Sequence, residues 1–89
     1  MSEPRPALLE FPCDFPIKAF GLCRDGLEEQ IVALVRRHAP DLAEDAIVSR
    51  ASGGGKYTAV TMTVRAQSQA QLDAIYQDLS ACPEVIMAL

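Results

Sequence analysis

The chain has 89 residues and a formal net charge of −4 at pH 7, with 49% hydrophobic and 22% charged residues. A chain of this length forms one domain with a small core, and its negative charge disfavours nucleic acid as a partner. No apolar run reaches the ~20 residues that a membrane-spanning helix needs, and the first residues lack the order of a signal peptide. We therefore expect a cytoplasmic protein without a membrane partner.

The cysteine and histidine content argues against a disulfide framework or a metal site. Cys13, Cys23 and Cys82 are odd in number and form no C-x-x-C pair. His38 is the only histidine, so no imidazole cluster can form. We expect no metal and no cofactor.

The chain divides into an N-terminal arm, residues 1–14, and one domain, residues 15–89. Three prolines make the arm irregular. The first strand is predicted from Pro16 to Cys23, where side chains alternate between two faces. A helix follows, with Asp25 and Glu28 as a capping box and Pro40 beyond its end. Its apolar stripe is Leu27, Ile31, Leu34, Val35 and His38.

The longest regular pattern lies in the second half of the chain. A short strand, Ala46 to Ala51, is joined by Gly53-Gly54-Gly55 to a long strand, Lys56 to Ala66. Ser68 and Gln71 form a second capping box before another helix. Its stripe is Leu72, Ile75, Tyr76 and Leu79, and Val85 to Leu89 reads as a final strand. One face of the long strand carries Thr58, Val60, Met62, Val64 and Ala66.

The order strand, helix, strand, strand, helix, strand predicts an α+β fold of the ferredoxin-like kind. Two crossover units interleave into a four-stranded antiparallel sheet with both helices on one face. The apolar stripes of the two helices supply the core, because each buried aliphatic side chain contributes ~1.5–3 kcal/mol.

The residues that could take part in catalysis do not indicate a reaction. The turn before Lys56 lacks the pattern and the following helix of a phosphate loop. Cys23 lies near the start of the first helix and His38 at its opposite end, three to four turns of ~5.4 Å away, so the two cannot meet as a nucleophile–base pair within one subunit. The chain has no asparagine, which an acylphosphatase-type enzyme on this fold requires. We predict a protein that is not an enzyme, with no catalytic residues.

The sheet face without helices is the candidate functional surface. An RNA-binding module would display Phe20 and Tyr57 there as stacking platforms, with Lys18 and Arg65 beside them. A protein-interaction module would instead use apolar bulk on that face. For a protein partner, the surface is predicted to comprise Lys18, Phe20, Leu22, Tyr57 and Thr61. A homodimer through an exposed sheet edge is also open.

The N-terminal arm is an alternative occupant of the same face. Leu8, Leu9 and Phe11 give it apolar side chains that could fold over the sheet. From the sequence, the arm and an external partner are equally good candidates, and both could contact the surface.

Five blocks of the sequence also match a known pattern in order along nearly the whole chain. They are Leu8-Leu9-Glu10-Phe11-Pro12, Phe15-Pro16-Ile17-Lys18, Arg37-His38-Ala39-Pro40, Gly55-Lys56-Tyr57 and Gln71-Leu72-Asp73-Ala74-Ile75-Tyr76. Together they resemble the YbeD family of small bacterial proteins. The resemblance implies a domain similar to the ACT domains that regulate amino-acid enzymes, and family members are often encoded beside lipoate-transfer enzymes.

That resemblance adds a candidate effector site and a class of partner. ACT domains bind small ligands where the first strand meets the first helix, and Arg24, Asp25 and Gly26 occupy that place here. Asp25 stands where the ACT turn usually has proline, and a likeness of fold is a weak basis for function. The implied role is regulatory, through an enzyme of lipoate or amino-acid metabolism.

Overall fold

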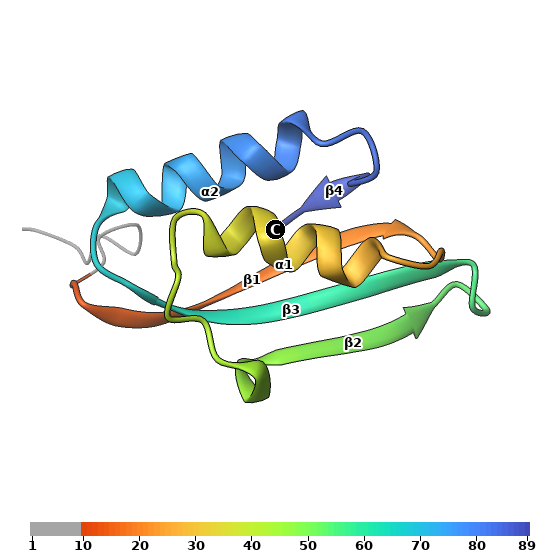
Figure 1. Ribbon diagram of the computed structural model, residues 1–89, viewed down its shortest axis with the longest axis horizontal. Helices are drawn as coiled ribbons and strands as arrows, with labels where there is room; N and C mark the ends of the chain where they lie inside the picture. The colour runs from red at the N-terminus through yellow and green to blue at the C-terminus, as the bar shows by residue number, and fades with distance from the viewer. Residues whose placement is uncertain (1–9) are drawn as a thin grey trace, which may run out of the picture.

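The computed structural model describes residues 10–89. Four strands, two α-helices and one short 3₁₀ helix follow the predicted order, and both α-helices lie on one side of the sheet (Figure 1). The elements are β1 (Cys13–Leu22), α1 (Leu27–Arg36), η1 (Glu44–Ala46), β2 (Ile47–Ser52), β3 (Tyr57–Ala66), α2 (Gln69–Ala81) and β4 (Met87–Ala88).

The sheet is antiparallel, with strand order β2-β3-β1-β4. Each βαβ unit places its two strands apart, so that the strands of one unit interleave with those of the other. The predicted α+β ferredoxin-like fold is therefore confirmed. The edges are β2 on one side and the two-residue β4 on the other.

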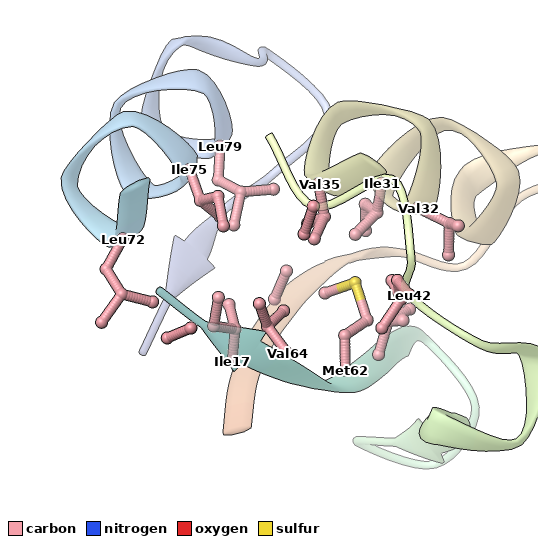
Figure 2. Close-up of a cluster of buried hydrophobic side chains, with 14 of the residues drawn as sticks. Ile17, Ile31, Val32, Val35, Leu42, Met62, Val64, Leu72, Ile75 and Leu79 are labelled. Atoms are coloured by element: carbon pink, nitrogen blue, oxygen red, sulfur yellow. The ribbon is translucent and has the colours of Figure 1, made fainter. Parts of the chain in front are cut away.

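The core lies between the helices and one face of β1 and β3. Along β3 the predicted alternation is confirmed, because Val60, Met62, Val64 and Ala66 are fully buried. Ile17 lies opposite Met62 in the β1–β3 pairing. Figure 2 shows side chains of both helices pointing toward these strands: Ile31, Val32 and Val35 from α1, and Leu72, Ile75 and Leu79 from α2.

The β2–β3 hairpin turn also follows its sequence. Gly53, Gly54 and Gly55 all have positive φ, between 58° and 91°. A side chain would make such backbone angles unfavourable, which explains the three glycines. The turn is closed by hydrogen bonds from Gly55 N to Ser52 O and from Lys56 N to Gly53 O.

The first strand begins earlier than predicted. It starts at Cys13, which pairs with Ala66, so the last two residues of the predicted arm belong to the sheet. Pro16 is accommodated because alternate residues of β1 direct their amides toward β4, as the bond from Lys18 N to Leu89 O shows. At Pro16 the described chain provides no β4 residue to pair with, so the missing amide hydrogen costs no sheet bond.

The predicted cap of α1 is wrong. Gly26 is the N-cap residue with φ 85°, and no side chain caps the helix. Glu28 does not reach back; its Oε1 accepts a hydrogen bond from Ser49 Oγ of β2, at 2.6 Å. The helix also ends at Arg36, so His38 lies beyond it. His38 Nε2 lies 2.7 Å from Asp78 Oδ2 of α2 and links the two helical segments.

The predicted cap of α2 is confirmed. Ser68 Oγ accepts a hydrogen bond from Gln71 N at 3.1 Å. The Gln71 side chain accepts from Gln67 N at 2.6 Å and donates to His38 O at 2.8 Å. The first turn of α2 is thus tied both to its own cap and to the segment after α1.

Gly21 permits a close approach between β1 and the chain that leads into β4. A Cβ atom at this position would lie 2.5 Å from the Glu84 carbonyl oxygen and 3.1 Å from Leu27. Directly beyond, Ile86 N donates to Phe20 O and Leu89 N donates to Lys18 O, both at 2.7 Å. The absence of a side chain at Gly21 therefore lets β4 dock beside β1.

We expect Ser68→Ala to lower the free energy of unfolding by about 1 kcal/mol, because it removes the only side-chain cap of α2. Urea denaturation provides the measurement. Ser80→Ala is the matched control, since Ser80 is exposed in the same helix, and it should leave stability unchanged or slightly raised. Equal losses in both variants would contradict the assigned cap.

We expect Gly21→Ala to destabilise the protein by about 1–3 kcal/mol through overpacking against Glu84 and Leu27. Amide hydrogen exchange should show the change most strongly at Ile86 and Leu89, whose bonds hold β4. Amides in the β2–β3 pairing provide the internal control. Uniform acceleration across the sheet would show that the contact does not act on β4 specifically.

Candidate interaction surface

The sheet face opposite the helices, here called the open face, holds all five residues predicted for the partner surface. Strand pairing places Lys18 opposite Thr61 and Leu22 opposite Tyr57, and Phe20 lies opposite Ala59. Their side chains share one face because alternate residues of a strand point the same way. The open face has no helix over it in the described chain (Figure 1).

Strand pairing adds residues that the sequence reasoning did not include in this surface. Val48 lies opposite Thr61, and Met87 lies opposite Phe20. Leu89 exchanges two backbone hydrogen bonds with Lys18, which places it on the same face. Large aliphatic side chains are exposed here: Leu22 by 52%, Val48 by 48%, Met87 by 51% and Leu89 by 61%. The signal that could have found them is the register of the two outer strands.

Polar contacts on this face lie at its borders. Arg65 Nη1 is 3.3 Å from Asp14 Oδ1, an exposed ion pair across β1 and β3. Lys56 Nζ lies 5.6 Å from the centre of the Tyr57 ring, within the range of a cation–π contact. Both contacts are exposed, and each contributes at most about 1 kcal/mol. Between these border contacts, the open face combines apolar side chains with Lys18 and Thr61.

The described part of the arm does not cover this surface. Phe11 is half-buried and packs against the helix-side core, as do Cys13 and Phe15. They are separated from Ile17 by even numbers of residues, so they point to the same side as Ile17, which faces the helices. The hypothesis that Phe11 folds over the open face is therefore wrong, while Leu8 and Leu9 lie outside the described residues.

The predicted effector turn, Arg24 to Gly26, is exposed at the junction of β1 and α1. Arg24 donates to Asp25 O at 2.9 Å, and its guanidinium also contacts Gln30 Oε1. Gln30 Nε2 donates to Glu84 Oε1 at 3.0 Å. Hydrogen bonds from Gln30, and then from Cys82, hold the pKa of Glu84 below its usual value. The turn thus begins a polar chain that reaches the segment before β4.

Two surface grooves lie elsewhere on the helix side. The larger, of about 650 Å³, is formed by α1, η1 and β2, with Val32 and Ile47 among its apolar lining and Arg36 and Glu44 among its charged lining. The smaller, of about 290 Å³, lies between α1 and α2 near Cys82. The three effector-turn residues line neither groove, so a ligand there would bind at the surface.

The remaining candidate residues are separate in the structure. Cys23 is exposed after β1, whereas His38 lies beyond the other end of α1, beside Asp78. Among residues 10–89 no three His, Cys, Asp or Glu side chains gather as a metal-ion site would require. Within the same range, no helix has the length and apolar character to cross a membrane.

Comparison with known proteins identifies the family of this chain. The profile of a family described as "Protein of unknown function (DUF493)" matches residues 6–89. A UPF0250 protein of Chromobacterium violaceum is 48% identical over 89 residues, all of both chains. A UPF0250 protein of Nitrosomonas europaea is 40% identical over 83 residues, which cover 93% of this chain and 95% of the relative.

A third relative also matches over nearly its full length. The UPF0250 protein of Ralstonia nicotianae is 44% identical over 88 residues, which cover 99% of this chain and 91% of the relative. Identity at this level over full-length chains confirms the family resemblance that the sequence blocks indicated. The chain belongs to the DUF493 family, whose curated bacterial members are the UPF0250 proteins.

Proposed function

We propose that this protein is a non-enzymatic interaction module and that its open face is the docking surface for a protein partner. The observation that carries the proposal is the exposure of Leu22, Val48, Met87 and Leu89 on a face that no helix of residues 10–89 covers. Exposed apolar side chains gathered on one surface mark association sites. They come from β1, β2 and the β4 segment, so a partner would span the whole sheet.

Covering the exposed apolar side chains would supply part of the free energy of docking. Leu22, Met87 and Leu89 are each about half exposed, so covering them would contribute about 1 kcal/mol apiece from apolar area alone. Phe20, half-buried among them, adds a rigid aromatic side chain, and aromatic residues are enriched at binding hot spots. Phe20 and Leu22 are two residues apart in β1 and therefore lie on the same face.

A regulatory role would use the turn that follows the docking strand. Arg24 to Gly26 begins two residues after Leu22, so a ligand that reorients this turn would act directly on the open face. The family resemblance supports an effector and an enzyme partner from amino-acid or lipoate metabolism. Self-association through the six-residue edge strand β2 is a further proposal, because an exposed edge can pair with another strand.

RNA binding is the second candidate function. Phe20 and Tyr57 lie on the two central strands of the open face, with Lys18, Arg50 and Arg65 on the same face. Both aromatics are half-buried, however, whereas the large apolar side chains that are exposed are aliphatic. Aliphatic side chains do not provide stacking surfaces for bases. These observations favour a protein partner.

We expect Leu22→Asp combined with Met87→Asp to abolish partner binding without unfolding the protein, because both side chains are exposed and their loss leaves the core intact. Quantitative mass spectrometry would compare proteins that the immobilised wild type and variant capture from a bacterial lysate. Ala33→Asp combined with Gln77→Asp is the control, since both residues are exposed on helices. A capture profile that survives the sheet variant but not the helix variant would exclude the open face.

We expect an effector of the Arg24–Gly26 turn to raise the melting temperature of the protein, because a ligand that binds only the native state stabilises it. A thermal-shift screen of amino acids and lipoate-related compounds is the measurement. The shift should disappear in Arg24→Ala. It should persist in Arg37→Ala, because Arg37 is a cation at the far end of α1. Absence of any shift at millimolar ligand would remove the effector site from the proposal.

A further inference from the structure

The charges of the sheet are segregated from those of the rest of the molecule. Three cations, Lys18, Arg50 and Arg65, occupy open-face positions of the strands, and Asp14 is the one carboxylate among those positions. The side chains at the open-face positions of the strands therefore carry a summed charge of +2, on a chain whose side chains sum to −4. A surface charge opposite in sign to that of the whole molecule selects partners by their local charge.

Two of these cations are available to a partner. Arg65 is paired with Asp14, but neither Lys18 nor Arg50 belongs to any ion pair or side-chain hydrogen bond within residues 10–89. Both side chains are exposed. Lys56, in the turn beside Tyr57, adds a third positive charge to the border of the same face.

The cations share the rows of the sheet with exposed aliphatic side chains. One row of the strand pairing contains Val48, Thr61, Lys18 and Leu89, and the next contains Arg50, Ala59, Phe20 and Met87. Neighbouring strands are about 4.8 Å apart, so each cation is within one or two strands of an exposed aliphatic group. A complementary ligand must therefore offer negative charge and apolar bulk at the same spacing.

A second copy of the chain does not meet this requirement face to face. Two open faces would each bring an excess of positive side chains to the interface, and like charges across an interface repel. A nucleic acid supplies the negative charge but not aliphatic side chains. The Tyr57 ring, which a base would need, already has Lys56 over it.

From this arrangement we infer that the partner of the open face is an acidic polypeptide segment with large apolar side chains. Its carboxylates pair with Lys18 and Arg50, while its apolar groups cover Leu22, Met87 and Leu89. The inference rests on the proposed function, because it names the chemistry of the partner for the same docking surface. It adds that charge, and not apolar area alone, determines which proteins bind.

The test uses a phage-displayed library of random dodecapeptides selected on the immobilised full-length protein. We expect the enriched peptides to be rich in Asp and Glu together with Leu, Ile, Phe or Met. The affinity of the best peptide, labelled and measured by fluorescence anisotropy, should fall as salt is raised, because charge pairs at the exposed rim are screened. Fluorescent oligouridine is the comparison probe for nucleic acid.

Three single substitutions distinguish the contribution of the open-face cations from an effect of net charge. Lys18→Glu and Arg50→Glu should each weaken peptide binding about tenfold, as expected when a contacting charge is reversed. Arg37→Glu, the matched control, changes the net charge equally on the helix side and should change affinity less than about twofold. Circular dichroism of each variant checks that the fold is retained.

The outcomes separate this inference from the proposed function. Peptides without acidic residues, whose binding is lost in Leu22→Asp but kept in Lys18→Glu, would retain the docking surface and overturn the acidic partner. Preferential binding of oligouridine, or a library that enriches nothing, would also overturn it. Binding that withstands Leu22→Asp, Lys18→Glu and Arg50→Glu alike would overturn both proposals.

Discussion

The pairing of β1 with β3 is the constraint on which the rest of the molecule depends. Ten residues of each strand are in register, from Cys13 opposite Ala66 to Leu22 opposite Tyr57. Because side chains alternate along a strand, this register assigns every residue of both strands to the helix side or to the open face. A slip of one strand by one residue would expose its buried side chains, Ile17 in β1 or Met62 in β3, both fully buried here.

The same constraint explains why an apolar surface remains outside the core. Two helices cover one face of a four-stranded sheet, and a chain of 89 residues has no third layer in its described part. Phe20 and Leu22 are therefore placed on the uncovered face by the alternation that buries Ala19 and Gly21. The proposed docking surface would give these apolar side chains the covering layer that residues 10–89 do not provide.

Much of the fold could be predicted because its signals are local. The alternation in β3, the three glycines of the turn and the Ser68 cap depend on neighbours in sequence, and all three are confirmed. The predicted capping box of α1 is wrong because Glu28 contacts Ser49, a partner far along the chain. For the same reason, the sequence identified Phe20 and Leu22 as surface residues but not Val48 or Met87, whose positions depend on strand register.

The hydrogen bonds between Leu89 and Lys18 have a practical consequence for work with this protein. Any peptide joined after Leu89 would leave the molecule at the rim of the sheet, beside an exposed lysine. A purification handle or fluorescent protein fused there would shield the area meant to be probed. At the other end of β1, Phe11 packs toward the helices and away from that area.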